Sequence, residues 1–219
     1  MDRRRFSLNV AGAAGALALA GAGLPGRARA QGGAPVEGRD YQALAKPVAV
    51  PPGGKIEVIE FFWYACPHCF AFEPLMSGWL AKAPADVRFR RVPVGFDARK
   101  KIHQRIYYTW EALGIVDQMH YKTFTRFHVQ KKPVDTLEDM LLFATESGLD
   151  PAKVSAAWRG FATDVKCKDA DRLTDAYDIQ FMPEIAIAGR FVAVAQPEQG
   201  PASVLATTDW LLDRIRHGR

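Results

Sequence analysis

The sequence predicts an α/β fold with a single domain that is interrupted by a helical subdomain. Three observations support this prediction. Residues 55–94 have the pattern strand, helix, strand; residues 97–163 are mostly helical; and the chain from residue 184 onward returns to two strands and a helix. With 219 residues, of which 48% are hydrophobic and 24% charged, the chain has enough apolar mass for one sizeable core.

The first thirty residues have the composition of an export signal. Arg3–Arg5 precede an apolar stretch that is rich in alanine and glycine and reaches Leu24, and Ala28-Arg29-Ala30 fits an A-x-A cleavage site. We therefore expect an exported, soluble protein that begins near Gln31. The glycines and the proline within the apolar stretch argue against the alternative of a membrane anchor.

The export route stays open, because RRRFSL resembles the twin-arginine signal pattern but Asp2 and Ser7 depart from it. Sec-dependent export is the alternative. The signal also contains most of the charge: of the net +5, the first thirty residues carry +4 and leave +1 for the rest. Nothing in that balance favours a nucleic-acid partner.

Residues 31–54 are rich in glycine, proline and alanine and are predicted to form a leader with one short strand near Val48. Residues 55–62 place apolar side chains on both faces, which is typical of a strand buried on both sides. A helix is predicted from residue 67 to about 82, with Pro74 expected to kink it. A second strand at 87–94 completes a strand-helix-strand unit.

The segment 97–163 is predicted to be an inserted helical subdomain. Apolar residues recur at helical spacing in two stretches before residue 128. A capping box, Thr136 with Asp139, predicts the start of a third helix. Asp150-Pro151 predicts a fourth, because aspartate is a good N-cap and proline is favoured at the first helical position.

Residues 164–219 are predicted to rejoin residues 31–96 in the main domain. A helix from about 164 to 177 leads to the strands EIAIA and FVAVA, which flank a tight Gly189-Arg190 turn and predict a hairpin. A last helix is expected after Gly200-Pro201.

The stretch WYACPHCFAF, residues 63–72, places two of the three cysteines two residues apart. A disulfide needs Cα atoms about 4.4–6.8 Å apart. Three residues along a strand span roughly 10 Å, whereas three along a helix span about 5 Å, so the pair closes only on a helix. Proline at the first helical position would make Cys66 the N-cap and put His68 and Cys69 at the second and third positions.

At an N-cap, the sulfur of Cys66 faces the backbone amides of His68 and Cys69 and the positive end of the helix dipole. These interactions, together with the His68 side chain, lower the pKa of Cys66 and stabilise its thiolate. A stabilised thiolate makes the disulfide a stronger oxidant. A substrate thiolate then attacks Cys66, and a second substrate thiol displaces it from the mixed disulfide.

Three alternatives compete with this redox role. A zinc site would need a second ligand pair, but Cys167 stands alone and no histidine pair has ligand spacing, so we expect no metal and no other cofactor. A purely structural disulfide would close too short a loop to stabilise much. His68 could be an incidental surface residue, although its place beside a thiolate favours a functional role.

Together these segments resemble the DsbA family of periplasmic thiol:disulfide oxidases. The resemblance rests on EFFWYACPHCFAFEP, the leader ALAKPVAVPPGGKIEVIEFF, the helical insertion and DIQFMPEIAIAGRF. It covers nearly all of the chain after the signal, and C-P-H-C is its most specific part. It implies a thioredoxin fold with an inserted helical domain, a periplasmic location, reduced exported proteins as substrates and a quinone-linked membrane reoxidase of the DsbB type.

The resemblance also implies roles for individual residues. Cys66 and Cys69 form the redox-active disulfide, as nucleophile and resolving cysteine, and the Pro67-His68 dipeptide tunes the potential. Pro183 matches the cis-proline whose preceding backbone, here Met182, pairs with the substrate peptide. An ordinary trans proline at a strand start is the alternative.

Glu60 matches the family's acidic residue beneath the cysteines, which can relay the proton of Cys69. A buried acid with a raised pKa suits that role, and a carboxylate paired with a nearby lysine or arginine is the alternative. Two features depart from the family. Met182, just before Pro183, replaces a valine, and Glu184, just after Pro183, would disfavour the thiolate. Cys167 is the second departure and is expected to be a small apolar residue within a helix.

Two rival functions stay open. A reductase or isomerase on the same fold usually has a separate dimerisation domain, for which no residues are left here, so a monomer is expected. A thiol-independent peptide-binding chaperone would use a hydrophobic groove beside Cys66 and would tolerate the loss of both cysteines.

Overall fold

The computed structural model describes residues 33–196 and 198–218. By its internal contacts the chain divides after Gly33, and the elements of the fold belong to the unit Ala34–Arg219. The predicted export signal lies outside the described residues. Among the helices that are described, none combines the length and the apolar character that crossing a membrane would require.

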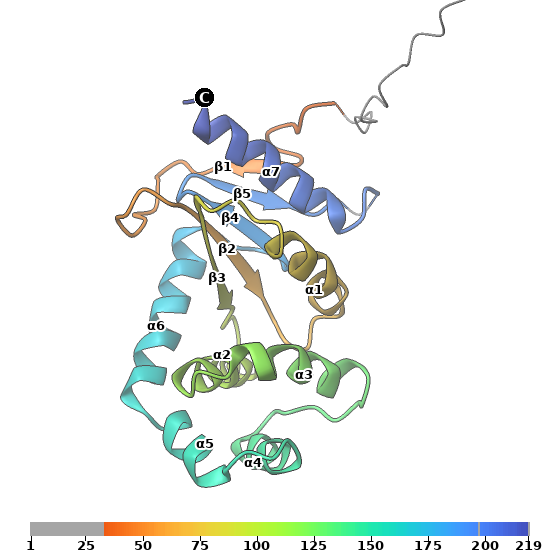
Figure 1. Ribbon diagram of the computed structural model, residues 1–219, viewed down its shortest axis with the longest axis vertical. Helices are drawn as coiled ribbons and strands as arrows, with labels where there is room; N and C mark the ends of the chain where they lie inside the picture. The colour runs from red at the N-terminus through yellow and green to blue at the C-terminus, as the bar shows by residue number, and fades with distance from the viewer. Residues whose placement is uncertain (1–32, 197, 219) are drawn as a thin grey trace, which may run out of the picture. The chain divides into compact units, whose positions relative to one another are not determined.

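A five-stranded sheet with the order β1-β5-β4-β2-β3 forms the centre of this unit (Figure 1). β2 and β3 are parallel, and every other neighbouring pair is antiparallel. The strands are β1 (Tyr41–Ala43), β2 (Ile56–Phe62), β3 (Val87–Pro93), β4 (Glu184–Ile187) and β5 (Phe191–Val194). The predicted strand-helix-strand unit is thereby confirmed, with α1 (Pro67–Leu80) as its helix.

The strand predicted near Val48 is wrong, because the leader pairs with the sheet earlier, through β1. Val48 still donates its backbone N–H to the Gly189 carbonyl at 2.8 Å. It cannot extend that contact into a ladder, since Pro47, Pro51 and Pro52 lack the N–H donors that a strand requires.

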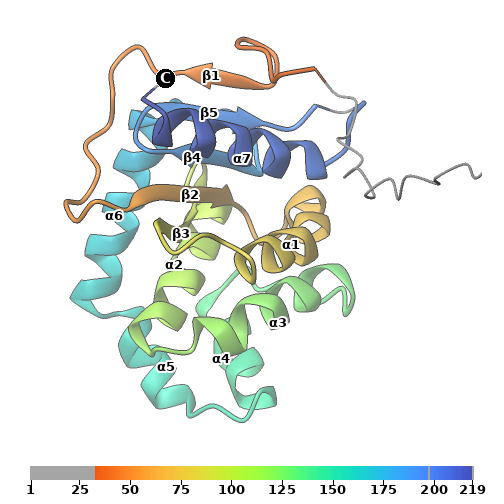
Figure 2. The same cartoon turned by 45° about the horizontal axis from the view of Figure 1, so that its top comes forward.

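Two helices, α1 and α7 (Ala202–Arg216), lie along one face of the sheet (Figures 1 and 2). The apolar residues between these helices and the sheet include Val58, Phe72, Met76, Ile185, Val204 and Leu211. A second cluster covers the opposite face and includes Ile59, Phe61, Ala170, Tyr177, Ala186 and Val192. The alternation of Val58 and Ile59 between the two clusters confirms that β2 is buried on both sides.

Five helices separate β3 from β4: α2 (Ala98–Ala112), α3 (Val116–His128), α4 (Leu137–Glu146), α5 (Pro151–Trp158) and α6 (Phe161–Ala176). The first four lie beyond the ends of β2 and β3, and α6 runs back along the sheet (Figures 1 and 2). The capping box of Thr136 and Asp139 and the N-cap of Asp150 are confirmed. The division into residues 31–96 with 164–219 and an insert of 97–163 stays a prediction.

The hairpin of β4 and β5 is confirmed, but its turn lies one residue earlier than predicted. Ala188 and Gly189 have positive φ values of 54° and 66°, and the Arg190 N–H donates to the Ile187 carbonyl at 3.0 Å. A Cβ atom at Gly189 would lie 2.1 Å from the Val48 carbonyl oxygen. Glycine is therefore required there by the backbone conformation and by the close approach of the leader.

Candidate active site

Cys66 is the N-cap of α1, and Pro67 occupies the first helical position, as predicted. The Cys69 backbone N–H donates to the Cys66 sulfur at 3.3 Å. Both residues are present as free cysteines and both are buried, Cys66 with 5% of its surface exposed and Cys69 with none. The sulfur of Cys66 therefore lies at the positive end of the helix, close to the groups that stabilise an anion.

The two cysteines differ sharply in acidity. The pKa of Cys66 falls from 9.0 to about 6, with a hydrogen bond from the Cys69 thiol as the largest cause. The backbone amides of Cys69 and His68 and the charge of His68 also lower it, whereas burial opposes them. Burial raises the pKa of Cys69, and the Cys66 thiol and the charge of Glu60 add to that rise. At neutral pH, Cys66 is a thiolate and Cys69 is a thiol.

The loop before β4 brings Met182 and Pro183 to this sulfur, across more than a hundred residues of sequence. When Cys66 is protonated, its thiol donates to the Met182 carbonyl at 3.6 Å, and the Met182–Pro183 peptide bond is cis. Beside it opens a cleft of about 510 Å³. Its walls include His68, Ala71, Phe181, Met182, Pro183, Glu184, Val194 and Ala195.

Glu184 is a buried acid in the wall of this cleft, with 4% of its surface exposed. Burial raises the pKa of its carboxyl to about 7, although the backbone amides of Gln180 and Phe181 lower it. The Gln180 N–H donates to Glu184 Oε2 at 3.3 Å. The carboxylate thus holds the loop that presents Met182, and the pKa of Cys66 is low in its presence.

Glu60 is completely buried in β2, as predicted. It is also paired with an arginine, which is the alternative that the sequence left open. Arg91, directly opposite in β3, donates its Nε–H to Glu60 Oε2 at 3.0 Å. Burial nevertheless raises the pKa of Glu60 to about 8; Arg91 lowers it, and the charge of Glu73 adds to the rise. When Glu60 is ionised its charge raises the pKa of Cys69, so this carboxyl lies close enough to influence the acidity of that thiol.

The ion pair of Glu60 and Arg91 continues into a longer network that the sequence did not reveal. Arg91 also donates to Glu73 of α1 at 3.2 Å, and Glu73 contacts His120 of α3 at 2.9 Å. His120 in turn contacts the hydroxyl of Tyr64 at 3.0 Å. Matched strand positions could have indicated the first pair, since Glu60 and Arg91 are each the fifth residue of a parallel strand.

Cys167 lies in α6, half-buried, and is packed against the apolar core rather than fully enclosed. Burial raises its pKa to about 11, which keeps the thiol protonated and weakly reactive. No group of three or more potential metal ligands occurs among the residues that the structure describes.

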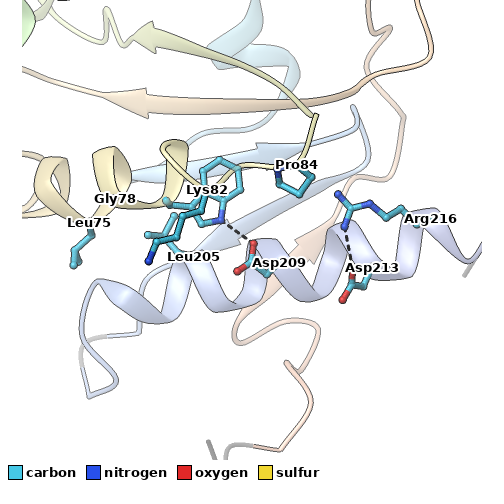
Figure 3. Close-up of a pocket in the computed structure, with 9 residues that line it drawn as sticks. Leu75, Gly78, Lys82, Pro84, Leu205, Asp209, Asp213 and Arg216 are labelled. Atoms are coloured by element: carbon cyan, nitrogen blue, oxygen red, sulfur yellow. Dashed lines mark hydrogen bonds and ion pairs between the residues drawn. The ribbon is translucent and has the colours of Figure 1, made fainter. Parts of the chain in front are cut away.

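A separate pocket of about 590 Å³ lies between α1 and α7, lined by side chains such as Leu75, Lys82, Leu205 and Asp209 (Figure 3). Four of its polar side chains, those of Trp79, Asp209, Asp213 and Arg216, are already paired. Trp79 donates to Asp209 at 2.7 Å, and Arg216 contacts Asp213 at 3.0 Å and Asp86 at 2.8 Å. None of the residues that line this pocket is a cysteine or a histidine.

Comparison with known proteins agrees with this site. Residues 57–205 match the family model of the DSBA-like thioredoxin domain. The thiol:disulfide interchange protein DsbA of Pseudomonas aeruginosa is 35% identical over 179 residues, which are 82% of this chain and 85% of that protein. DsbA of Burkholderia cepacia is 33% identical over 195 residues, covering 87% of this chain and 91% of that protein.

Solved structures give the same result. The crystal structure of Pseudomonas aeruginosa DsbA has a TM-score of 0.79 at 34% identity and covers 83% of this chain and 94% of that one. The oxidoreductase DsbA from Xylella fastidiosa has a TM-score of 0.78 at 27% identity, covering 84% and 98%. The fold is therefore the thioredoxin fold of these proteins, and the chain belongs to the DsbA-like thioredoxin family of thiol:disulfide oxidoreductases.

Proposed function

We propose that this oxidoreductase works in the oxidising direction and introduces disulfide bonds into exported proteins. The observation that carries the proposal is the position of the Cys66 sulfur, which receives the Cys69 amide 3.3 Å away at the start of α1. This position stabilises the reduced, ionised form of Cys66. Because the disulfide has no such stabilisation, the equilibrium favours transfer of the disulfide to a substrate.

The proposed reaction has two exchange steps. A substrate thiolate attacks Cys66 of the Cys66–Cys69 disulfide; the S–S bond breaks and Cys69 leaves. Because the pKa of Cys69 is raised, its sulfur must gain a proton, which we assign to Glu60. A second substrate thiolate then attacks the substrate sulfur of the mixed disulfide and expels Cys66 as a thiolate. The substrate loses two electrons, and the enzyme gains them.

Substrate peptides are proposed to bind along the loop of Met182 and Pro183. The Met182 carbonyl lies 3.6 Å from the Cys66 sulfur, so a peptide backbone that pairs there would bring its cysteine to the reacting atom. The adjoining cleft offers apolar side chains, among them Phe181 with 73% of its surface exposed. The flexible, polarisable side chain of Met182 fits acceptance of varied sequences.

The family and the N-terminal sequence support a proposal for the cellular setting. We propose that the protein is periplasmic, that its signal is cleaved between Ala30 and Gln31 and that it acts as a monomer. A quinone-linked membrane partner of the DsbB type would reoxidise it. The reductase or isomerase direction is the rival proposal. It would require the disulfide to be more stable than the acidity of Cys66 allows.

Oxidation of a reduced model protein by stoichiometric disulfide-form enzyme tests the proposal. Wild-type protein should form substrate disulfides at the expense of its own, whereas Cys66→Ser should form none. Cys167→Ser is the matched control and should behave as wild type. Equal effects of wild type and Cys66→Ser on substrate folding would instead indicate a chaperone that does not depend on thiols.

A further inference from the structure

A continuous network of polar side chains, all buried except the half-buried Arg91, links the sheet beneath the cysteines to helix α3. Its contacts are Glu60 to Arg91 at 3.0 Å, Arg91 to Glu73 at 3.2 Å, Glu73 to His120 at 2.9 Å and His120 to Tyr64 at 3.0 Å. Glu60 and Tyr64 are completely buried, Glu73 is 2% exposed and His120 is 5% exposed. This network holds two carboxyl groups, those of Glu60 and Glu73, but only one guanidinium, that of Arg91.

That imbalance leaves a proton to be placed. Arg91 can neutralise one carboxylate, and a second buried carboxylate beside the first would be strongly unfavourable, so the pair retains one proton. Arg91 alone does not decide where it resides, because it donates to both Glu60 and Glu73. The carboxyl groups of Glu60 and Glu73 differ, however, in the other hydrogen bonds that they receive.

His120 creates the difference. A carboxylate can only accept, so Nε2–H of His120 donates to Glu73 Oε1, and Nδ1 then accepts from the Tyr64 hydroxyl. Glu73 therefore receives hydrogen bonds at both oxygens. Glu60 receives one at Oε2, while its Oε1 has no partner among the described residues.

We propose that His120 is a positioning residue that decides which carboxyl holds the shared proton: by donating to Glu73 it keeps Glu73 ionised and reserves the proton for Glu60. This inference deepens the proposed function, since it rests on Glu60 as the proton carrier for Cys69. Tyr64 supports the arrangement by holding His120 in the tautomer that donates from Nε2.

The acidities of Glu73, His120 and Glu60 agree with this arrangement. Burial raises the pKa of Glu73, but the bonds from His120 and Arg91 outweigh it and leave the pKa lowered. Burial lowers the pKa of His120, which keeps the imidazole neutral despite Glu73. The charge of Glu73 in turn contributes to the raised pKa of Glu60.

Other titratable groups face this cluster from each neighbouring element. Cys69 of α1 lies within reach of the charge of Glu60, and Tyr107 of α2 experiences the charges of both glutamates. Asp117 of α3 acts on His120 from its own helix. None of these groups donates a hydrogen bond to Glu73, so His120 is its one donor besides Arg91 within the described part of the chain.

The test is a pH titration of reduced protein that carries ¹³C-labelled glutamate carboxyl groups, followed by NMR. Glu60→Gln and Glu73→Gln assign the two signals. In wild type, Glu60 should titrate near pH 8 and Glu73 should be ionised at pH 7. In His120→Leu, which cannot donate, the midpoint of Glu60 should fall by about one pH unit or more and that of Glu73 should rise.

His120→Gln is the matched control, because its amide can donate to Glu73 from nearly the same place; it should keep the wild-type midpoints. Adding His120→Leu to Glu73→Gln should shift Glu60 no further, since His120 acts through Glu73. An unchanged midpoint of Glu60 in His120→Leu would overturn the proposal.

A measurement on wild-type protein tests the proposal even if His120→Leu does not fold. NMR of ¹⁵N-labelled histidine should give the neutral Nε2–H tautomer for His120 throughout the titration of Glu60; a Nδ1–H tautomer or an imidazolium at pH 7 would contradict the proposal. The role of Glu60 is judged separately. If Glu60→Gln oxidises substrate with the wild-type pH profile, the relay is wrong, while the effect of His120 on the glutamates stands or falls on the NMR result alone.

Discussion

The backbone amide of Cys69 lies 3.3 Å from the sulfur of Cys66, so one turn of helix holds both halves of the redox pair and also solvates the anion that forms on one of them. The same turn separates the acidities of the two cysteines: Cys66 is the N-cap and accepts hydrogen bonds that lower its pKa, whereas Cys69 is completely buried and its pKa is raised. The chemistry of this protein follows from that asymmetry.

Removing the Cys69 thiol should weaken the thiolate of Cys66. The hydrogen bond from Cys69 is the largest cause of the low pKa, so Cys69→Ala should raise the midpoint from about 6 by about one pH unit or more. Ultraviolet thiolate absorbance against pH measures it. Cys69→Ser keeps a donor at the same place and serves as the control; if alanine and serine gave the wild-type midpoint alike, the assignment of this hydrogen bond would be wrong.

The stability of the reduced protein should depend on pH in a window set by Cys66. Its pKa is about 6 in the folded state and 9.0 ordinarily, so folding favours the thiolate, and the stabilisation present above pH 9 is lost as the pH falls through 6. The disulfide form has no such group. Urea titrations give the unfolding free energy of the reduced protein and of the oxidised protein at each pH. The value for the reduced protein minus that for the oxidised protein should increase as the pH rises from 6 to 9. A difference that does not change with pH would contradict this prediction.

The buried contacts of Glu60 and Glu73 with Arg91 predict a large loss of stability when this cation is removed. Arg91→Met leaves Glu73 without its counter-charge and Glu60 without its donor, and breaking a buried pair costs about 3–5 kcal/mol. Urea unfolding at neutral pH gives the value. Arg216→Met, which removes exposed contacts to Asp86 and Asp213, is the control and should cost clearly less.

Glu184 should make the protein less stable as the pH rises. Its pKa is raised from 4.5 to about 7, so the folded state retains a proton that the unfolded state has lost, and stability falls between these two pH values. Glu184→Gln cannot titrate but keeps an acceptor for the Gln180 amide. The midpoint temperature of unfolding of the variant, relative to that of wild type, should increase as the pH rises from 4.5 to 7. If the difference between the two midpoint temperatures stayed constant, Glu184 would not titrate with a raised pKa in the folded state.

Local signals in the sequence predicted the parts of the site that depend on neighbours in the chain. Pro67 determined the register of α1 and hence the cap at Cys66, and the pairing of Thr136 with Asp139 determined the start of α4 in the same way. Each of these features needs only a few consecutive residues, and each was confirmed.

The sequence could not predict the features that depend on tertiary contacts. Glu73 and His120 are 47 residues apart and belong to different helices, so no spacing relates them. The leader strand lies at Tyr41–Ala43 rather than near Val48 because it pairs with β5, a strand that is remote in the sequence. Only the assembled sheet and helices bring these groups together.

Equilibration of the purified protein with reduced and oxidised glutathione tests the central claim most directly. If the start of α1 stabilises the Cys66 thiolate, the Cys66–Cys69 pair should have a reduction potential well above the value of about −270 mV that is typical of thioredoxin, and glutathione should reduce it readily. A potential near or below that value, with a disulfide that resists glutathione, would contradict the account.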